Sequence, residues 1–340
     1  MSDNERQAVE GSETPRQAGM GRGIQTAVYA VGGGAALFVL ASLAFDLGII
    51  SDRGDPSARS ETVAKPSSFQ PPSESKIPDG PAGDAIRRGQ AIFMNTGANA
   101  GQFVGNQLAC ANCHLDGGRK ANSAPMWAAW VIYPMYRSKN KQINTMEDRV
   151  KGCFTYSMNA QGSPSGGPPP GGHDVYKDLQ TYMHWLATGA PTGEKMEGGG
   201  YPELEKTAMG YDPERGRQVY AAKCATCHGS DGQGQQDLNG RVVFPPLWGP
   251  ESYNWGAGMG RVNTAAGFIK ANMPLGQGNS LTDQQAWDAA AFIDSRERPK
   301  DPRQKGSVAK NAKANHGGDS YYGKIIEGRL IGVGVQTGKP

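Results

Sequence analysis

Apolar side chains and strong charge are both scarce in this sequence. Only 37% of the 340 residues are hydrophobic, whereas 49 glycines and 23 prolines make up about a fifth of the chain. That composition indicates extensive loops around small cores, in a chain long enough for two or three domains. The net charge is +3 and no basic run is interleaved with aromatic residues, so nothing supports nucleic-acid binding.

Cysteine is rare too, and its placement is the strongest signal. Four of the five cysteines form two C-x-x-C pairs, each followed directly by histidine. Disulfides or zinc are alternatives for such pairs, but C-x-x-C-H is the spacing of covalent haem attachment, with the histidine as an axial ligand. We therefore predict two covalently bound haem c groups, which also explain the low apolar content because a haem replaces core side chains. The attachment residues are Cys110, Cys113, Cys224 and Cys227, and the proximal iron ligands are His114 and His228.

One long apolar segment lies near the N-terminus. Residues 27–45 carry no charge, and a span of about 20 residues crosses a bilayer. We predict a membrane anchor over 27–50 after a cytoplasmic segment, 1–26; a signal peptide cleaved after Ala44 is the alternative. Similarity to c-type cytochromes implies haem attachment outside the cytoplasmic membrane. The expected location is therefore periplasmic, anchored to the inner membrane, or soluble in the periplasm if the segment is cleaved.

Each haem motif lies between two predicted helices. Helical periodicity and caps predict helices over 84–94 and 175–187 around the first motif, and over 213–222 and 282–295 around the second. This order of helix, haem motif, loops and helix resembles the class I cytochrome c fold. The expected fold is mainly α, with two class I cytochrome c-like domains in tandem after the transmembrane helix.

The remaining segments complete the expected domain organisation. Residues 51–81 are rich in serine, proline and charge, as in a flexible tether. The last 41 residues show neither helical nor strand periodicity, which predicts a mostly extended tail. The predicted domains are 82–195 and 211–299 for the two cytochrome c domains, 196–210 for a linker and 300–340 for the tail.

The sixth iron ligand determines what each haem does. Met273 precedes a proline 45 residues after His228, which is the distal-ligand pattern of small class I cytochromes. A thioether ligand raises the haem potential, as suits electron transfer, and Lys270 is a minor alternative. The first motif has no comparable Met-Pro pair. Its candidates are His173, His184 and Cys153.

Cys153 is the one cysteine outside the haem motifs. The simplest interpretation is a small buried hydrophobe. However, its surroundings in sequence are cationic, and nearby positive charge lowers a thiol's pKa and attracts small dianions. A thiolate beside iron and cations suits sulfur redox chemistry. The cationic residues are Arg137, Lys139, Lys141, Arg149 and Lys151.

These features together resemble the dihaem thiosulfate dehydrogenases that form tetrathionate. The resemblance covers roughly residues 81–295. It rests on both haem motifs, on the sequences 133–137, 148–154 and 157–159, and on Asn272-Met273-Pro274. It implies that Cys153 is the distal ligand and catalytic sulfur at the first haem, that Arg149 binds substrate, and that Lys139 is a second cation. Some members of the family have lysine where this chain has Asn272, so we expect the His228/Met273 ligand pair at the second haem.

The implied reaction joins two thiosulfates into tetrathionate. Cys153 is expected to engage one thiosulfate, with a covalent adduct as one form, while the two cations offset its charge. Electrons would pass from the first haem to the second and then to an external cytochrome or similar redox protein. Two alternatives remain open. One is a membrane-tethered dihaem electron carrier without its own substrate, and the other is a Sox-system cytochrome that acts on a carrier protein.

Overall fold

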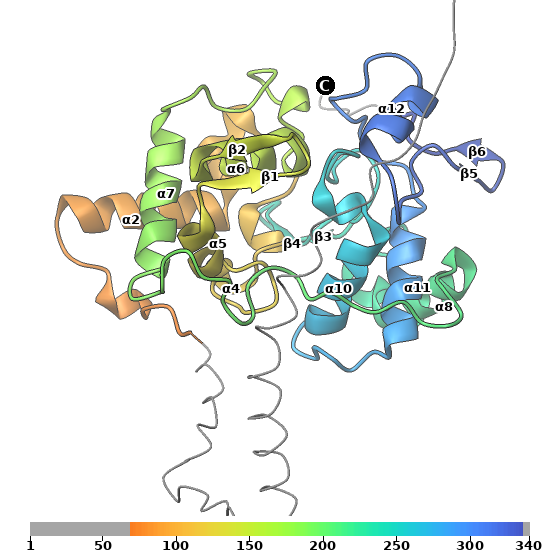
Figure 1. Ribbon diagram of the computed structural model, residues 1–340, viewed down its shortest axis with the longest axis horizontal. Helices are drawn as coiled ribbons and strands as arrows, with labels where there is room; N and C mark the ends of the chain where they lie inside the picture. Colours follow the sequence, from red (N-terminus) through yellow and green to blue (C-terminus); the bar gives the residue numbers. More distant parts are fainter. Residues whose placement is uncertain (1–68, 336–340) are drawn as a thin grey trace, which may run out of the picture. The chain divides into compact units, whose positions relative to one another are not determined.

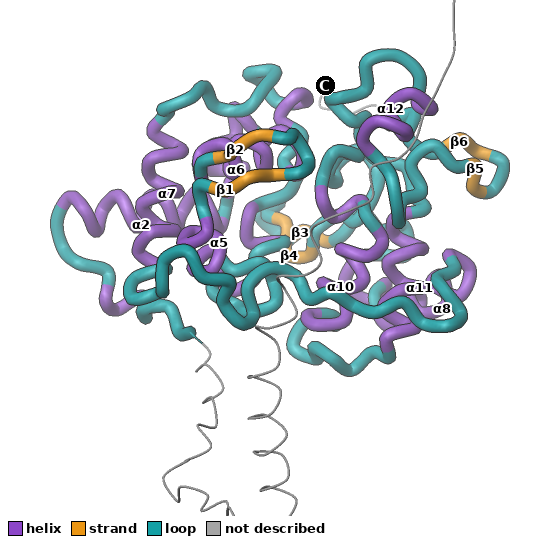
Figure 2. The backbone as a smooth tube through the Cα atoms, in the orientation of Figure 1, coloured by secondary structure: helices purple, strands orange, loops and turns teal. Residues whose placement is uncertain are grey.

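The computed structural model describes residues 69–335, which lie in one compact unit. The fold is mainly helical, as predicted, with three two-stranded sheets among the described residues (Figure 2). No helix within residues 69–335 is long and apolar enough to span a membrane. The predicted cytoplasmic segment 1–26, the anchor 27–50 and most of the tether lie outside the described residues.

The first lobe, residues 81–195, is built on two long helices, α2 and α7 (Figure 1). Its helices are α2 (Pro81–Met94), α3 (Thr96–Ala100), α4 (Leu115–Gly118), α5 (Met126–Ile132), α6 (Met146–Gly152) and α7 (Asp174–Leu186). Strands β1 (Met135–Arg137) and β2 (Gln142–Asn144) form an antiparallel hairpin. Short 3-10 turns span Glu74–Lys76, Gly101–Phe103, Cys110–Asn112 and Ala160–Gly162, and a π-helical turn spans Cys153–Ser157.

The second lobe, residues 211–299, repeats this plan with fewer elements. Its helices are α8 (Pro213–Lys223), α9 (Ala225–His228), α10 (Val262–Asn272) and α11 (Asp283–Asp294). A 3-10 turn spans Gly258–Gly260, and β3 (Gln235–Gln236) pairs antiparallel with β4 (Val242–Phe244). The four helices predicted from sequence are confirmed to within three residues at each end, including Pro213 as the first residue of α8 and Thr282 as the cap of α11.

The same helix crossing stabilises both lobes. Helix α2 packs on α7, and α8 packs on α11. At each crossing a glycine admits the partner backbone: a Cβ on Gly89 would lie 2.1 Å from the carbonyl oxygen of Asp178, and one on Gly216 would lie 1.9 Å from that of Asp288. The arginine before each glycine forms a bidentate ion pair with the same aspartate, at 2.9 Å in the first lobe and 2.8 Å in the second. Only glycine permits so close an approach.

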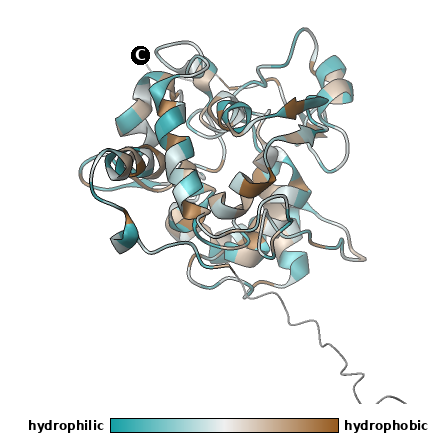
Figure 3. Cartoon of the chain, turned by 60° about the vertical axis from the view of Figure 1, so that its left-hand side comes forward, coloured by the Kyte–Doolittle hydropathy of each residue, from teal (hydrophilic) through white to brown (hydrophobic). Residues whose placement is uncertain are grey.

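Each amphipathic helix packs its apolar face against a core and exposes its polar face. In α2, Ile86 and Phe93 are buried whereas the neighbouring Arg87 is exposed. The helical ribbons accordingly change from brown to teal around their circumference in Figure 3. One apolar cluster consists mainly of first-lobe residues but also includes Tyr253 and Ala257 of the second lobe. The other joins second-lobe residues to Val308, Tyr321, Tyr322 and Ile331 of the C-terminal segment, and Met259 packs against both clusters. Each haem motif therefore lies against a core to which another part of the chain contributes.

The C-terminal segment, residues 300–335, differs from the extended tail that the sequence predicts. It contains α12 (Val308–Asn315) and the antiparallel strands β5 (Ile325–Ile326) and β6 (Arg329–Leu330). Buried polar contacts organise it: Asp301 accepts hydrogen bonds from Arg303, His316 and Asn311. Polar side chains that pair only after folding leave no periodic signal, which is why the pattern appeared extended.

Buried amides join the two lobes. Asn254 of the second lobe donates to the carbonyl oxygen of Thr155 at 2.9 Å, inside the π-helical turn that begins at Cys153. Asn106 of the first lobe donates to the carbonyl oxygen of Ser252 at 3.0 Å. Because both asparagines are buried, these bonds are costly to break and hold the turn against the second lobe.

Candidate active site

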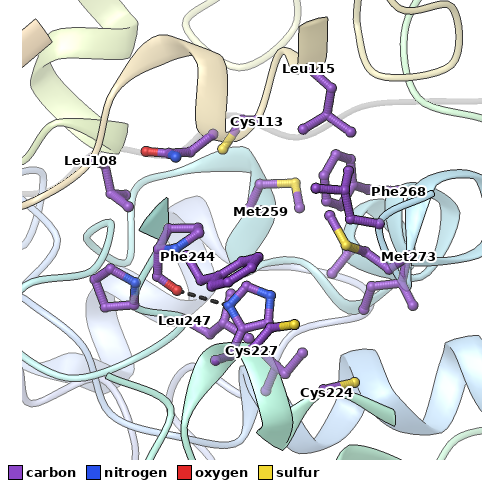
Figure 4. A pocket seen from close by; sticks show the side chains of 18 of the residues that line it. Leu108, Cys113, Leu115, Cys224, Cys227, Phe244, Leu247, Met259, Phe268 and Met273 are labelled. Atoms are coloured by element: carbon purple, nitrogen blue, oxygen red, sulfur yellow. Dashed lines mark hydrogen bonds between the residues drawn. The ribbon is translucent and has the colours of Figure 1, made fainter. Parts of the chain in front are cut away.

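An apolar cavity of about 250 Å³ lies beside the second C-x-x-C-H motif. Cys224 and Cys227 border it on one side and Met273 and Phe268 on another (Figure 4). Residues of the first lobe's motif, Cys113 among them, border it as well. A flat apolar group attached through two thioethers fits this lining, and the neighbouring motifs lie close together.

His228 is oriented as an axial ligand requires. Its Nδ1 bonds to the carbonyl oxygen of Pro245 at 2.9 Å, the dashed line in Figure 4, so Nε2 is left for iron. Burial lowers the pKa of His228, which favours the neutral, metal-binding ring. Met273 contributes a thioether to the same cavity. His228 and Met273 are thus the two residues of this cavity that could hold a haem iron.

The other residues considered as ligands have different partners. Lys270 donates to the carbonyl oxygen of Leu281 at 2.7 Å and pairs with Asp283 at 2.9 Å. His173 caps α7 by accepting from the backbone of Val175. His184 is exposed and packs its ring on Trp130. These contacts favour Met273 and Cys153 as the distal candidates.

His114 in the first lobe has the same orientation as its counterpart. Its Nδ1 bonds to the carbonyl oxygen of Ala124 at 2.8 Å, so Nε2 is again left for iron. Beside it, the backbone N–H of Cys110 donates to the hydroxyl of Thr96 at 3.2 Å, which fixes the start of the motif. The hydroxyl of Tyr133 is buried without a hydrogen-bond partner among the described residues, as expected if a polar group completes this site.

Cys153 lies within electrostatic reach of His114. It begins the π-helical turn at the end of α6, where Phe154 is buried and anchors the turn. Burial raises the pKa of the Cys153 thiol, but the charge of Arg149, the hydrogen bond with His114 and the charge of Lys139 outweigh it and lower the pKa to about 6. The thiol is therefore largely thiolate at neutral pH. A thiolate that faces a haem-ligand histidine can ligate iron or bond to a sulfur substrate.

Arg149 and Lys139 reach this thiol from different elements. Arg149 is one helical turn before Cys153, on α6, and the thiol is the main influence that raises the pKa of the guanidinium. Lys139 lies in the β1–β2 turn. Its ammonium lies 3.9 Å from the centre of the Tyr156 ring and donates to the carbonyl oxygen of Gly256 at 2.6 Å. The structure thus brings the three predicted catalytic residues into one electrostatic environment.

The structure also adds residues that sequence reasoning did not select. Tyr156, three residues after Cys153, supports the Lys139 ammonium. Arg303 lies 5.3 Å from the centre of the same ring, measured from its guanidinium carbon. Tyr156 could have been selected from the sequence, because residues three apart lie on the same face of a helix. No local pattern links Arg303, about 150 residues along the chain, to this site.

These geometries define a class: a c-type cytochrome oxidoreductase with a cationic, thiol-bearing site at one of its haem motifs. The cytochrome c family matches residues 213–297, which are most of the second lobe. That match confirms the predicted cytochrome c domain there and implies haem c.

Comparison with known proteins is more specific. Thiosulfate dehydrogenase of Stutzerimonas stutzeri (strain A1501) is 50% identical, covering 79% of this chain and 86% of its own length. That of Thiomonas intermedia (strain K12) is 48% identical, covering 86% of this chain and 90% of its own length. The solved thiosulfate dehydrogenase (TsdBA) of Marichromatium purpuratum is 52% identical with a TM-score of 0.78; the match covers 80% of this chain but spans 59% of that one. The chain belongs to the thiosulfate dehydrogenase family, as the sequence predicted, and is an oxidoreductase.

Proposed function

We propose that this chain oxidises two thiosulfates to tetrathionate at a site formed by Cys153, Arg149 and Lys139. It does so with two haem c groups, one bound through the first motif with His114 and Cys153 as iron ligands, the other through the second with His228 and Met273. The proposal is supported by relatives named thiosulfate dehydrogenase and by two complete donor sets in the fold.

One observation carries this proposal: the lone cysteine lies where the charges of Arg149, His114 and Lys139 all act on its thiol. A plain electron carrier needs neither a thiolate at the first haem nor cations beside it. Thiosulfate is a small dianion with a nucleophilic sulfur, so both features match its chemistry. The adjacent cations compensate the charge that accumulates when thiolate and dianion meet.

The chemistry at Cys153 proceeds in two balanced steps. The thiolate bonds to the outer sulfur of one thiosulfate, and two electrons leave, so that a Cys153–S–SO₃⁻ adduct results. The outer sulfur of a second thiosulfate then attacks the sulfur bonded to Cys153. A sulfur–sulfur bond forms, the bond to Cys153 breaks, and tetrathionate departs with the thiolate regenerated. When bound, the haems supply one-electron acceptors that take the two electrons toward an external redox protein.

Cys153→Ala tests this assignment. We expect thiosulfate oxidation to fall by about 10³-fold or more because the nucleophile is lost. The thiolate signature of the first haem in electron paramagnetic resonance should also disappear. Lys151→Gln, a change at an exposed residue two positions earlier, is the control and should leave both readouts at parental values. A Cys153→Ala protein with both haems bound and the parental rate would refute the mechanism.

We also propose that the haem-bearing lobes lie in the periplasm, held to the inner membrane through 27–50. Covalent haem attachment and the uncharged run 27–45 support this location. Fractionation of cells that express the full chain tests it. Haem-stained protein is expected in the membrane fraction at full length. Recovery in the soluble periplasmic fraction, shortened at residue 44, would instead support signal cleavage.

A further inference from the structure

The two-step reaction proposed above needs two binding places for dianions. The first thiosulfate lies against Cys153, where Arg149 is the cation that most lowers the pKa of the thiol. The second must approach an adduct that is itself negatively charged. Like charges repel strongly where water is partly excluded, so this approach requires cations farther from the cysteine.

Two such cations share one aromatic ring. The ammonium of Lys139 lies 3.9 Å from the centre of the Tyr156 ring, and the guanidinium carbon of Arg303 lies 5.3 Å from it. Lys139 comes from the β1–β2 turn and Arg303 from the C-terminal segment, so two remote parts of the chain converge here. Tyr156 itself belongs to the turn that begins at Cys153, which connects this pair of cations to the catalytic sulfur.

Arg303 is rigidly oriented by Asp301. Its Nε and Nη2 donate to the two carboxylate oxygens at 3.0 and 2.7 Å. Asp301 is 1% exposed and also accepts from His316 at 2.6 Å and from Asn311 at 3.2 Å. Within residues 69–335 the remaining nitrogen, Nη1, has no hydrogen-bond partner. One edge of the guanidinium is therefore held in place while the other is available to a ligand.

The local charge favours an anion. Desolvation lowers the pKa of Lys139 to about 7, and the charges of Arg303, Arg149 and Arg261 act in the same direction. Among the main charges that act on Lys139 within residues 69–335, the one carboxylate is Asp301, which already accepts hydrogen bonds from three donors. Positive charge thus exceeds negative charge around the Tyr156 ring. A bound dianion would relieve the repulsion among these cations.

We propose that Lys139 and Arg303, which both lie near the Tyr156 ring, form a second anion subsite that holds the attacking thiosulfate. This inference rests on the proposed function. The subsite positions the outer sulfur of the second thiosulfate toward the adduct on Cys153. Arg303 serves this second step, whereas Lys139 also acts on the Cys153 thiol in the first. Arg303 is thereby a substrate-positioning residue contributed by the C-terminal segment.

Arg303→Gln, Arg303→Lys and the control Arg329→Gln test the subsite. Arg329 is an exposed arginine of the same segment, on β6, and its side chain forms no hydrogen bond or ion pair within residues 69–335. For each holoprotein the KM for thiosulfate is measured with ferricyanide as electron acceptor. The fraction of Cys153 that carries the adduct is measured by mass spectrometry after brief exposure to thiosulfate.

We expect Arg303→Gln to raise the KM about tenfold, as loss of one charged hydrogen bond does, and to accumulate the adduct because the first step survives. Arg303→Lys should restore the KM to within about threefold, and Arg329→Gln should match the parent in both readouts.

Two results would overturn the subsite. One is an Arg303→Gln protein with the KM and adduct level of Arg329→Gln. The other is an equal KM defect in Arg303→Gln and Arg303→Lys with equally lowered melting temperatures, which would show a structural role for Arg303. A parent that forms neither adduct nor tetrathionate refutes the proposed function itself, and so is distinguished from failure of the subsite alone.

Discussion

The two lobes share a scaffold but differ in what faces the haem site. Both cross their long helices at an Arg-Gly pair, and both anchor the motif histidine through Nδ1, at 2.8 Å to Ala124 and 2.9 Å to Pro245. The first lobe then presents the Cys153 thiol among cations, whereas the second presents Met273 in an apolar cavity. The scaffold is therefore shared, and what differs between the lobes is the charge around Cys153 and Met273, the two proposed distal ligands.

After Cys153→Ala, the largest expected effect comes from a cation of the first lobe and sharpens this contrast. Arg149→Gln should lower kcat/KM for thiosulfate about 100-fold, because a charged hydrogen bond to the substrate is lost and the thiol loses the cation that most lowers its pKa. Steady-state kinetics with thiosulfate measure the change. Lys151→Gln on the same helix is the matched control, expected at parental values. Equal kinetics for the two variants would mean that the cationic surroundings of Cys153 are incidental.

Met273→Ala probes the second lobe. We expect the potential of one haem to fall by about 0.1 V or more, since thioether ligation favours reduced iron. Spectroelectrochemical titration resolves the two haems, and the thiolate signature of the other should persist. Met209→Ala, at a methionine that is 65% exposed, should change neither haem. An unaltered potential in Met273→Ala would show that a different side chain ligates the second iron.

The shared scaffold is tested by substitutions at the helix crossings. Gly89→Ala and Gly216→Ala should each reduce the free energy of unfolding by about 1–3 kcal/mol, because the added Cβ overlaps a carbonyl oxygen at 2.1 and 1.9 Å. Gly97→Ala in α3, where a Cβ would meet no atom within 4 Å, is the control and should not destabilise. Chemical denaturation of the holoprotein gives the values. If only one crossing proved sensitive, the lobes would not be equivalent scaffolds.

The smallest expected effect concerns pH. Burial, together with the charges of Arg303, Arg149 and Arg261, lowers the pKa of Lys139 to about 7 against the opposing charge of Asp301. Lys139 is therefore cationic below that pH and neutral above it. We therefore expect kcat/KM for thiosulfate to fall about threefold to tenfold between about pH 6 and 8. Lys139→Arg retains its charge and should flatten this decline, whereas Lys141→Arg on the same hairpin should preserve it. A decline that persists unchanged in Lys139→Arg would assign the titration to another group.

Sequence reasoning located elements whose signals are local. The helices around each motif follow from periodicity and caps, which depend on neighbouring residues, and their bounds agreed closely with the structure. Cys153 was selected as a candidate site residue because it is the one cysteine of five that lies outside the two haem motifs. The C-terminal segment was mistaken for an extended tail because its order depends on Asp301, whose partners His316 and Arg303 are recognisable only in three dimensions.

By itself, the sequence determined the haem motifs, the mainly helical class and the family, since these depend on spacing and on residue identity along the chain. Only the tertiary structure decided what surrounds the thiol. It brought Lys139 to Gly256 and Arg303 to Tyr156, contacts between segments about 117 and 147 positions apart. Charge acts through space, so the environment that distinguishes a catalytic sulfur from a buried one is formed only when distant segments pack together.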